Sequence, residues 1–284
     1  MSEASDPSET KVVPAANRIR ASGPILILAA MFVAATFLAW YFTWFGRGLS
    51  DPDISKYLSD TKNPRHVQHA LLQIQQKMER RDPAARNWYP QIQALSESPE
   101  TEFRLTIAWL MGFDNQSKEF HEALLRLVRD TEPIVRRNAA LALVRFNDSS
   151  GREELVAVLK PYEVKAVASG LVASSLHAGS EISRGALLVR IQQGDGKVLE
   201  VRSPLPGKID QVLRPNGSQV TQGETLLMIN SDEGSIWEAL RGLSFVGTKD
   251  DLPTIQSYAD SQSVSNRVQE QAKLTSRAIE ARKN

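Results

Sequence analysis

The chain has 284 residues, and its 34 basic and 33 acidic side chains nearly cancel, so no global charge favours nucleic acid as a partner. It has no cysteine, which excludes disulfides, thiolate metal sites and cysteine nucleophiles. Behind a tail and an anchor, its length leaves room for one or two folded domains.

The chain begins with two segments that differ sharply in polarity. Residues 1–20 are rich in Ser, Ala, Pro and charge, which predicts a disordered tail. Residues 21–46 contain no Asp, Glu, Lys or Arg and are apolar on every face, which predicts one transmembrane helix, since about 20 apolar residues span a bilayer. A secretory signal is the alternative, but this run is longer than a signal's apolar core and ends in interface-favouring aromatic residues.

Basic residues on the two sides of this run predict its orientation. Lys11, Arg18 and Arg20 precede it, whereas Arg47 and then Lys56 follow it. Basic residues are retained on the cytoplasmic side, so we expect a cytoplasmic N-terminus and an extracytoplasmic bulk, which is periplasmic in a diderm bacterium.

Residues 51–162 show helical periodicity in short segments with brief polar joints, which predicts an antiparallel helical array. Setting Leu95 on Leu127, a shift of 32 residues, also aligns Phe103 with Val135 and Arg104 with Arg136. The segment therefore contains an internal repeat, and such units must stack to cover their apolar faces.

The second copy resembles the HEAT-repeat pattern, in which an Asp and a Pro precede Val-Arg and then a pair of small residues. The residues that carry this resemblance are Asp130, Pro133, Val135, Arg136, Ala139, Ala140 and Leu143. We expect Pro133 to begin a second helix, the alanines to let helices approach closely, and Arg136 to reach Asp130 or turn carbonyls. An irregular helical domain is the alternative.

Between residues 163 and 231 the helical period is lost, and Gly, Ser and Val occur in short alternating runs that predict strands. Residues 169–191 and 206–229 align with a single gap at Asn216. The aligned glycines are Gly170 with Gly207, Gly179 with Gly217 and Gly185 with Gly223. Spaced glycines suit tight turns, so two similar halves related by a pseudo-dyad are expected.

This double pattern, with Pro206-Gly207-Lys208-Ile209 in its second half, resembles the biotinyl/lipoyl (barrel-sandwich hybrid) domain. Carrier versions of that domain display a modified lysine at the hairpin between the halves, where this chain has Lys197. The carrier signatures around that lysine are missing, and Gly194-Asp195-Gly196 predicts a plain tight turn. The domain is also similar to that of membrane fusion proteins, but the connection here is too short for their long α-hairpin.

Residues 234–284 return to helical periodicity and predict a C-terminal helical hairpin. Gly247 to Pro253 again resembles a HEAT turn, and this resemblance implies that Arg267 takes the place of Arg136. The β module is then inserted into, or placed between, helical repeats.

No catalytic constellation, phosphate loop or zinc motif is visible. His66 and His69 have metal-chelating spacing but lack a third ligand in the sequence, so a solvated helix face is favoured. Asp250-Asp251 is interpreted as a helix N-cap.

The predicted fold class is therefore multidomain α and β: a transmembrane helix, HEAT-like repeats, an all-β barrel-sandwich hybrid and a helical hairpin. We expect a membrane-anchored, non-enzymatic scaffold with protein partners and no cofactor, nucleic acid or small-molecule substrate. The alternatives are a periplasmic adaptor of a transport complex, or a biotin or lipoate carrier through Lys197.

Overall fold

A computed structural model describes residues 23–44 and 48–282. The predicted tail, both ends of the predicted membrane segment and the basic residues Lys11, Arg18, Arg20 and Arg47 lie outside the described residues. The chain divides into two compact units, residues 1–49 and residues 50–284.

In the first unit, helix α1 (Gly23–Trp44) carries no charged residue. Its stretch Gly23–Tyr41 is long and apolar enough to cross a membrane, and none of it is buried within the protein. A secretion signal near an N-terminus has the same length and composition, so α1 fits either role.

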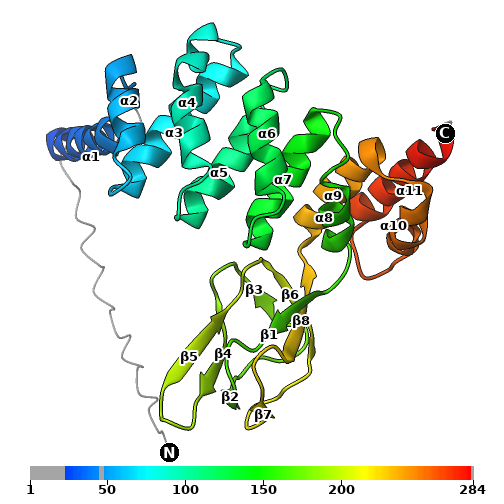
Figure 1. The fold of residues 1–284 in the computed structure, drawn as a ribbon. Helices are drawn as coiled ribbons and strands as arrows, with labels where there is room; N and C mark the ends of the chain where they lie inside the picture. The colour runs from blue at the N-terminus through cyan, green and yellow to red at the C-terminus, as the bar shows by residue number, and fades with distance from the viewer. Residues whose placement is uncertain (1–22, 45–47, 283–284) are drawn as a thin grey trace, which may run out of the picture. The chain divides into compact units, whose positions relative to one another are not determined.

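The second unit contains five successive helix pairs (Figure 1). The first helices of the pairs are α2 (Asp51–Ser59), α4 (Tyr89–Leu95, after the 3-10 turn η1, Pro83–Trp88), α6 (Lys118–Leu127), α8 (Arg152–Val158) and α10 (Leu252–Ala259, after the 3-10 turn η2, Lys249–Asp251). The second helices are α3 (Pro64–Glu79), α5 (Thr101–Met111), α7 (Pro133–Arg145), α9 (Glu233–Val246) and α11 (Asn266–Ala281). Each second helix packs on its own partner and on the second helix of the next pair.

Local sequence explains where these helices begin. Pro64 and Pro133 each occupy the first turn of a second helix, where a missing N–H costs nothing. Ser117 and Asp232 cap α6 and α9 by accepting hydrogen bonds from backbone N–H groups in the first turn. Pro133 therefore begins α7, as the sequence predicts.

The eight strands of the described residues lie between α8 and α9 and gather in one module (Figure 1). They are β1 (Tyr162–Lys165), β2 (Gly170–Ala173), β3 (Glu181–Ile182), β4 (Leu187–Gln192), β5 (Val198–Arg202), β6 (Gly207–Val212), β7 (Gln219–Val220) and β8 (Thr225–Ser231). They form two four-stranded sheets with the orders β1-β8-β6-β3 and β5-β4-β2-β7, and in the described part of the chain neither sheet closes into a barrel.

The two sheets are related by a shift of four strands. Advancing each strand number by four, cyclically, converts the first sheet order into the second, so β1–β4 and β5–β8 each contribute two strands to each sheet. The aligned glycines share backbone conformations: φ is +159° at both Gly170 and Gly207, and +78° and +85° at Gly185 and Gly223. The internal repeat seen in the sequence is thus a repeat of structure.

Gly170 and Gly207, at the starts of β2 and β6, are glycines because the backbone of a neighbouring strand lies very close to them. A Cβ at Gly207 would lie 2.1 Å from the carbonyl oxygen of Asn230, and one at Gly170 would lie 2.4 Å from that of Gln192. Any side chain at these positions would collide with the neighbouring strand, so glycine is required there.

Candidate interaction surface on the second helices

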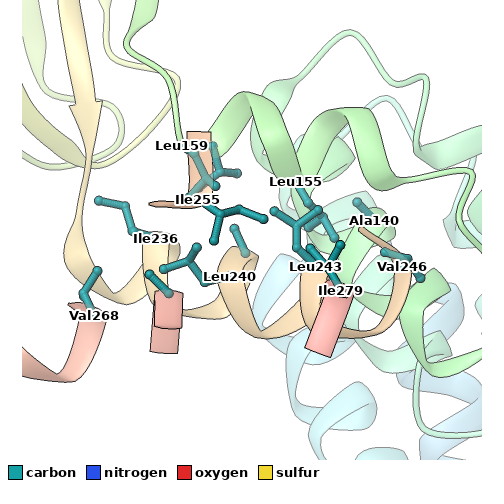
Figure 2. Close-up of a cluster of buried hydrophobic side chains, with 13 residues drawn as sticks. Ala140, Leu155, Leu159, Ile236, Leu240, Leu243, Val246, Ile255, Val268 and Ile279 are labelled. Atoms are coloured by element: carbon teal, nitrogen blue, oxygen red, sulfur yellow. The ribbon is translucent and has the colours of Figure 1, made fainter. Parts of the chain in front are cut away.

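The β module is inserted within the fourth helix pair and does not interrupt the helical array. Its strand β1 follows α8 and its last strand β8 leads into α9, yet α8 and α9 pack on one another. Their shared core joins Leu155 and Leu159, before the insertion, to Leu240 and Leu243 after it (Figure 2). Of the two arrangements considered from the sequence, insertion into the repeats is therefore the observed one.

A small residue lets two helices of this core meet. Ala140 on α7 is fully buried, and a Cβ built on Gly151 would lie 2.6 Å from its Cα. Ala140 thus lies in the kind of close approach expected of it, and Ala139 is fully buried beside it. Val135 is fully buried in the same helix.

Arginines link successive helix pairs at the turns. Arg104 on α5 donates to both carboxylate oxygens of Asp130, at 2.7 and 3.0 Å, and its Nη1 donates to the carbonyls of Ser98 and Pro99. Arg136 repeats the carbonyl contacts: its Nη1 donates to the carbonyl oxygens of Asp130 and Thr131, at 2.9 and 3.1 Å.

The sequence leaves two partners open for Arg136, the Asp130 side chain or carbonyls at the turn. The structure selects the carbonyls, because Arg104 takes the Asp130 carboxylate, and the Nε of Arg136 donates to Glu154 at 3.0 Å. Burial raises the pKa of Asp130, but the hydrogen bonds from Arg104 and the Glu132 N–H outweigh it and leave the pKa below its ordinary value.

The same type of link crosses the insertion. Arg152 on α8 donates from Nε and Nη2 to the two oxygens of Asp251, both at 2.8 Å, although 99 residues separate them. Asp251 is buried and also accepts from the Thr248 N–H at 2.7 Å. Its pKa lies below the ordinary value, because these hydrogen bonds outweigh the opposing effect of burial. Asp251 occupies the N-cap position of α10, as predicted, but its side chain makes no cap bond there and accepts from Thr248 and Arg152 instead.

Arg267 does not take the place of Arg136, so that prediction is wrong. Its guanidinium lies 4.2 Å from the centre of the Trp237 ring, and among the described residues it has no ion pair. Arg267 lies on α11 in the last pair, and Trp237 on α9 offers it an aromatic face instead.

A buried arginine lies near the base of the insertion. Arg137 on α7 is only 5 % exposed, its Nε is 4.0 Å from Glu154, and neither Nε nor Nη1 has a hydrogen-bond partner among the described residues. Burial lowers the pKa of Arg137, and the nearby carboxylates of Glu154 and Asp232 oppose that effect. Its burial favours a structural role for this residue over a solvated one.

The other residues of the β module that the sequence analysis singled out lie in its turns and connections. Pro206 lies in the connection between β5 and β6, and Gly217 and Gly223 take positive φ values of 84° and 85°. Lys197 is exposed at the β4–β5 hairpin, where its backbone N–H donates to Asp195.

The two neighbouring histidines on α3 have separate partners. His66 Nδ1 lies 2.7 Å from Asp60, and its ring stacks on Tyr57. His69 contacts Gln73 instead. Across residues 23–44 and 48–282, no group of three or more His, Cys, Asp or Glu side chains could hold a metal ion.

The described helical array exposes its large apolar side chains on the second helices. These side chains are Leu72 on α3, Trp109 on α5, Phe245 on α9 and Leu274 on α11. A groove of about 470 Å³ lies among α5, α7 and α9 and is lined by both apolar and polar residues. These are Trp109, Asn138, Leu141, Ala142, Val144, Arg145, Glu238, Arg241, Gly242 and Phe245. We call it the second-helix groove. Sequence periodicity missed it because its residues come from three helices.

Comparison with known proteins supports the helical part of this description. Residues 90–171, from α4 into β2, match the family model for HEAT repeats. No curated protein shows significant similarity to the chain. The HEAT resemblance carried by Asp130, Pro133, Val135, Arg136 and Ala139 is therefore supported for this segment.

Proposed function

We propose that the protein is a membrane-anchored, non-enzymatic scaffold that presents a HEAT-type helical array and a lipoyl-like β module to protein partners. The observation that carries this proposal is the unbroken array of second helices with exposed apolar side chains and a groove among them. HEAT arrays generally mediate protein interactions, and such extended surfaces suit large partners.

Two features support a rigid presentation of the β module. Two antiparallel strands, β1 and β8, connect it to the helices, with Tyr162 paired to Ile229 at the junction. In addition, Arg184 in the module forms an ion pair with Glu102 on α5. A double connection restrains an inserted module more than a single linker does.

We infer that the β module is related to the barrel-sandwich hybrid domain. Two observations support this inference: the two halves exchange strands between the sheets, and Gly170 and Gly207 share the same backbone conformation. A periplasmic adaptor role has less support, because the halves are joined by the short β4–β5 hairpin in place of a long helical hairpin.

Affinity recovery from a detergent extract of native membranes tests the scaffold. The full chain should retain at least one protein partner in stoichiometric amount through size-exclusion chromatography. A chain recovered alone under several mild detergents contradicts the proposal, whereas recovery with a transporter and an outer-membrane channel favours the adaptor.

We further propose that α1 stays attached as the anchor, with the N-terminus cytoplasmic. The intact mass of the natural protein should include residues 23–44 without a cleavage. Because the chain has no cysteine, Gly194→Cys introduces a single thiol on the exposed hairpin, and a membrane-impermeant maleimide should label it from outside. Labelling only after membrane rupture contradicts the orientation.

Carrier function through Lys197 is a second candidate, favoured by its exposed position on the hairpin that joins the halves. The same intact-mass measurement decides it. A mass equal to that of the unmodified sequence removes the carrier function, and an added biotinyl or lipoyl mass located on Lys197 establishes it.

A further inference from the structure

We propose that the second-helix groove binds an acidic amphipathic segment of a partner protein, with apolar side chains of the partner beside Phe245 and beside Trp109 and its carboxylates on Arg145 and Arg241. This inference rests on the proposed scaffold function and names the site and chemistry of its partner.

The apolar part of the groove is large and accessible. Phe245 is 61 % exposed and Trp109 is 40 % exposed, at opposite ends of the set of helices that line the groove. Leu141, Ala142 and Val144 of α7 line it as well. Exposed apolar side chains beside charged ones are typical of interaction sites. A cleft of about 470 Å³ is within the size range that holds a ligand or several side chains.

The polar lining carries positive charge that the chain leaves without a carboxylate. The Arg145 guanidinium lies over the Phe113 ring at 5.0 Å and donates to the Gly112 carbonyl at 3.3 Å. Arg241 lies over the Trp237 ring at 5.6 Å. Within residues 23–44 and 48–282, neither arginine has an ion pair, whereas six other arginines of the array do.

Arg145 and Arg241 differ from the arginines that link successive helix pairs, and this difference indicates that they can bind a partner's carboxylates. Arg104, Arg136 and Arg152 are held by carboxylates at 2.7–3.0 Å. Arg145 and Arg241 are exposed and lie over aromatic rings, which keeps each guanidinium in place. Arg145 Nη1 donates to the Gly112 carbonyl, and its remaining N–H groups are available to a carboxylate.

A third arginine adds to the positive field. Arg282 donates to the carbonyl oxygens of Phe245 and Leu243, so its charge lies at the C-terminal end of α9. Against these, the groove lining has one carboxylate, Glu238. The balance favours an acidic partner segment over a basic one, and a charged rim around an apolar centre matches helix-in-groove recognition.

The test is peptide selection on the full chain held in lipid nanodiscs. A random 16-residue display library is selected on the wild-type chain, and the enriched peptides are synthesised and measured by fluorescence anisotropy. We expect an enriched pattern that combines Phe, Leu or Trp at three- to four-residue spacing with Asp or Glu. Enrichment of basic or uncharged peptides, or none above empty nanodiscs, overturns the proposal.

Variants locate the binding. Phe245→Ser should weaken an enriched peptide at least about tenfold, and Arg241→Glu at least about fivefold, with recovery when one Glu of the peptide is replaced by Arg. The matched controls are Leu171→Ser, an exposed apolar residue on the β module, and Lys118→Glu, an exposed cation on a first helix. Both controls should bind as wild type does. Equal binding to Phe245→Ser, or a Phe245-dependent dimer of the chain, overturns the proposal.

The two proposals fail in different ways. If Phe245→Ser recovers the same partners from native membranes as wild type, the groove proposal falls and the scaffold stands. If no partner is recovered but acidic peptides bind at Phe245, the groove stands and the scaffold function falls. Because Phe245 and Arg241 are exposed, the thermal midpoints of their variants should stay close to that of the wild type, which circular dichroism checks.

Discussion

Replacing Asp251 by Asn tests whether the helices before and after the insertion form one array. The carboxylate is 4 % exposed and accepts two charge-assisted hydrogen bonds from Arg152, both at 2.8 Å, as well as the Thr248 N–H. Breaking one such bond costs about 1.5–3 kcal/mol. The Arg152 side chain is 25 % exposed, so water recovers part of its loss, and we expect about 3 kcal/mol in total.

For a folded unit of this size, a loss of about 3 kcal/mol lowers the thermal midpoint by about 6–12 °C. The measurement is thermal and urea unfolding of the full chain in detergent, followed by circular dichroism. A double-mutant cycle of Arg152→Met with Asp251→Asn isolates the pair and should give a coupling of about 1.5–3 kcal/mol.

The matched control is Glu270→Gln, which removes a surface ion pair between Glu270 and Lys273 on α11. Exposed pairs of this kind contribute little, so the midpoint should not change measurably. The reasoning is refuted if Asp251→Asn leaves the midpoint within about 1 °C of wild type, or if Arg152 and Asp251 show no coupling.

Three further predictions concern other parts of the fold. Gly207→Ala places a Cβ against the Asn230 carbonyl oxygen and should destabilise the β module by about 2–4 kcal/mol. Gly194→Ala, which meets no atom within 4 Å, is its control, and faster amide exchange confined to the β module is the expected signal. Arg137→Met removes a buried charge without hydrogen bonds at Nε and Nη1, while Glu154 keeps its closer partner Arg136, so the urea midpoint should rise by the equivalent of about 1–3 kcal/mol; a fall contradicts it. The pKa of Asp251 is lower in the folded than in the unfolded state, so its stabilisation is complete above about pH 4 and is lost as the pH falls further. Acid unfolding followed by circular dichroism should therefore be less steep in Asp251→Asn than in wild type.

Local signals in the sequence predicted much of this structure. Proline in a first turn, as at Pro133, and small residues such as Ala140 act through their immediate neighbours, so their roles follow from sequence alone. The glycine spacing of the two halves likewise reports turns that each half must make, and Gly185 and Gly223 take the same positive φ region.

Contacts between distant segments could not be predicted in this way. Arg152 and Asp251 meet only because α8 and α9 pack across the inserted strands. Arg267 likewise faces Trp237 on α9, a contact between helices that its own sequence context, which resembles that of Arg136, does not encode. The groove at Phe245 depends on three helices whose relative placement no periodicity encodes.

Crosslinking with mass spectrometry in native membranes tests the central claim, that the chain is a scaffold for protein partners, most directly. The account predicts recurrent crosslinks between lysines of the folded unit, such as Lys118 or Lys273 near the helices and Lys197 or Lys208 on the β module, and at least one other protein. Crosslinks confined to the chain itself, at reagent levels that link known complexes in the same membranes, would contradict it.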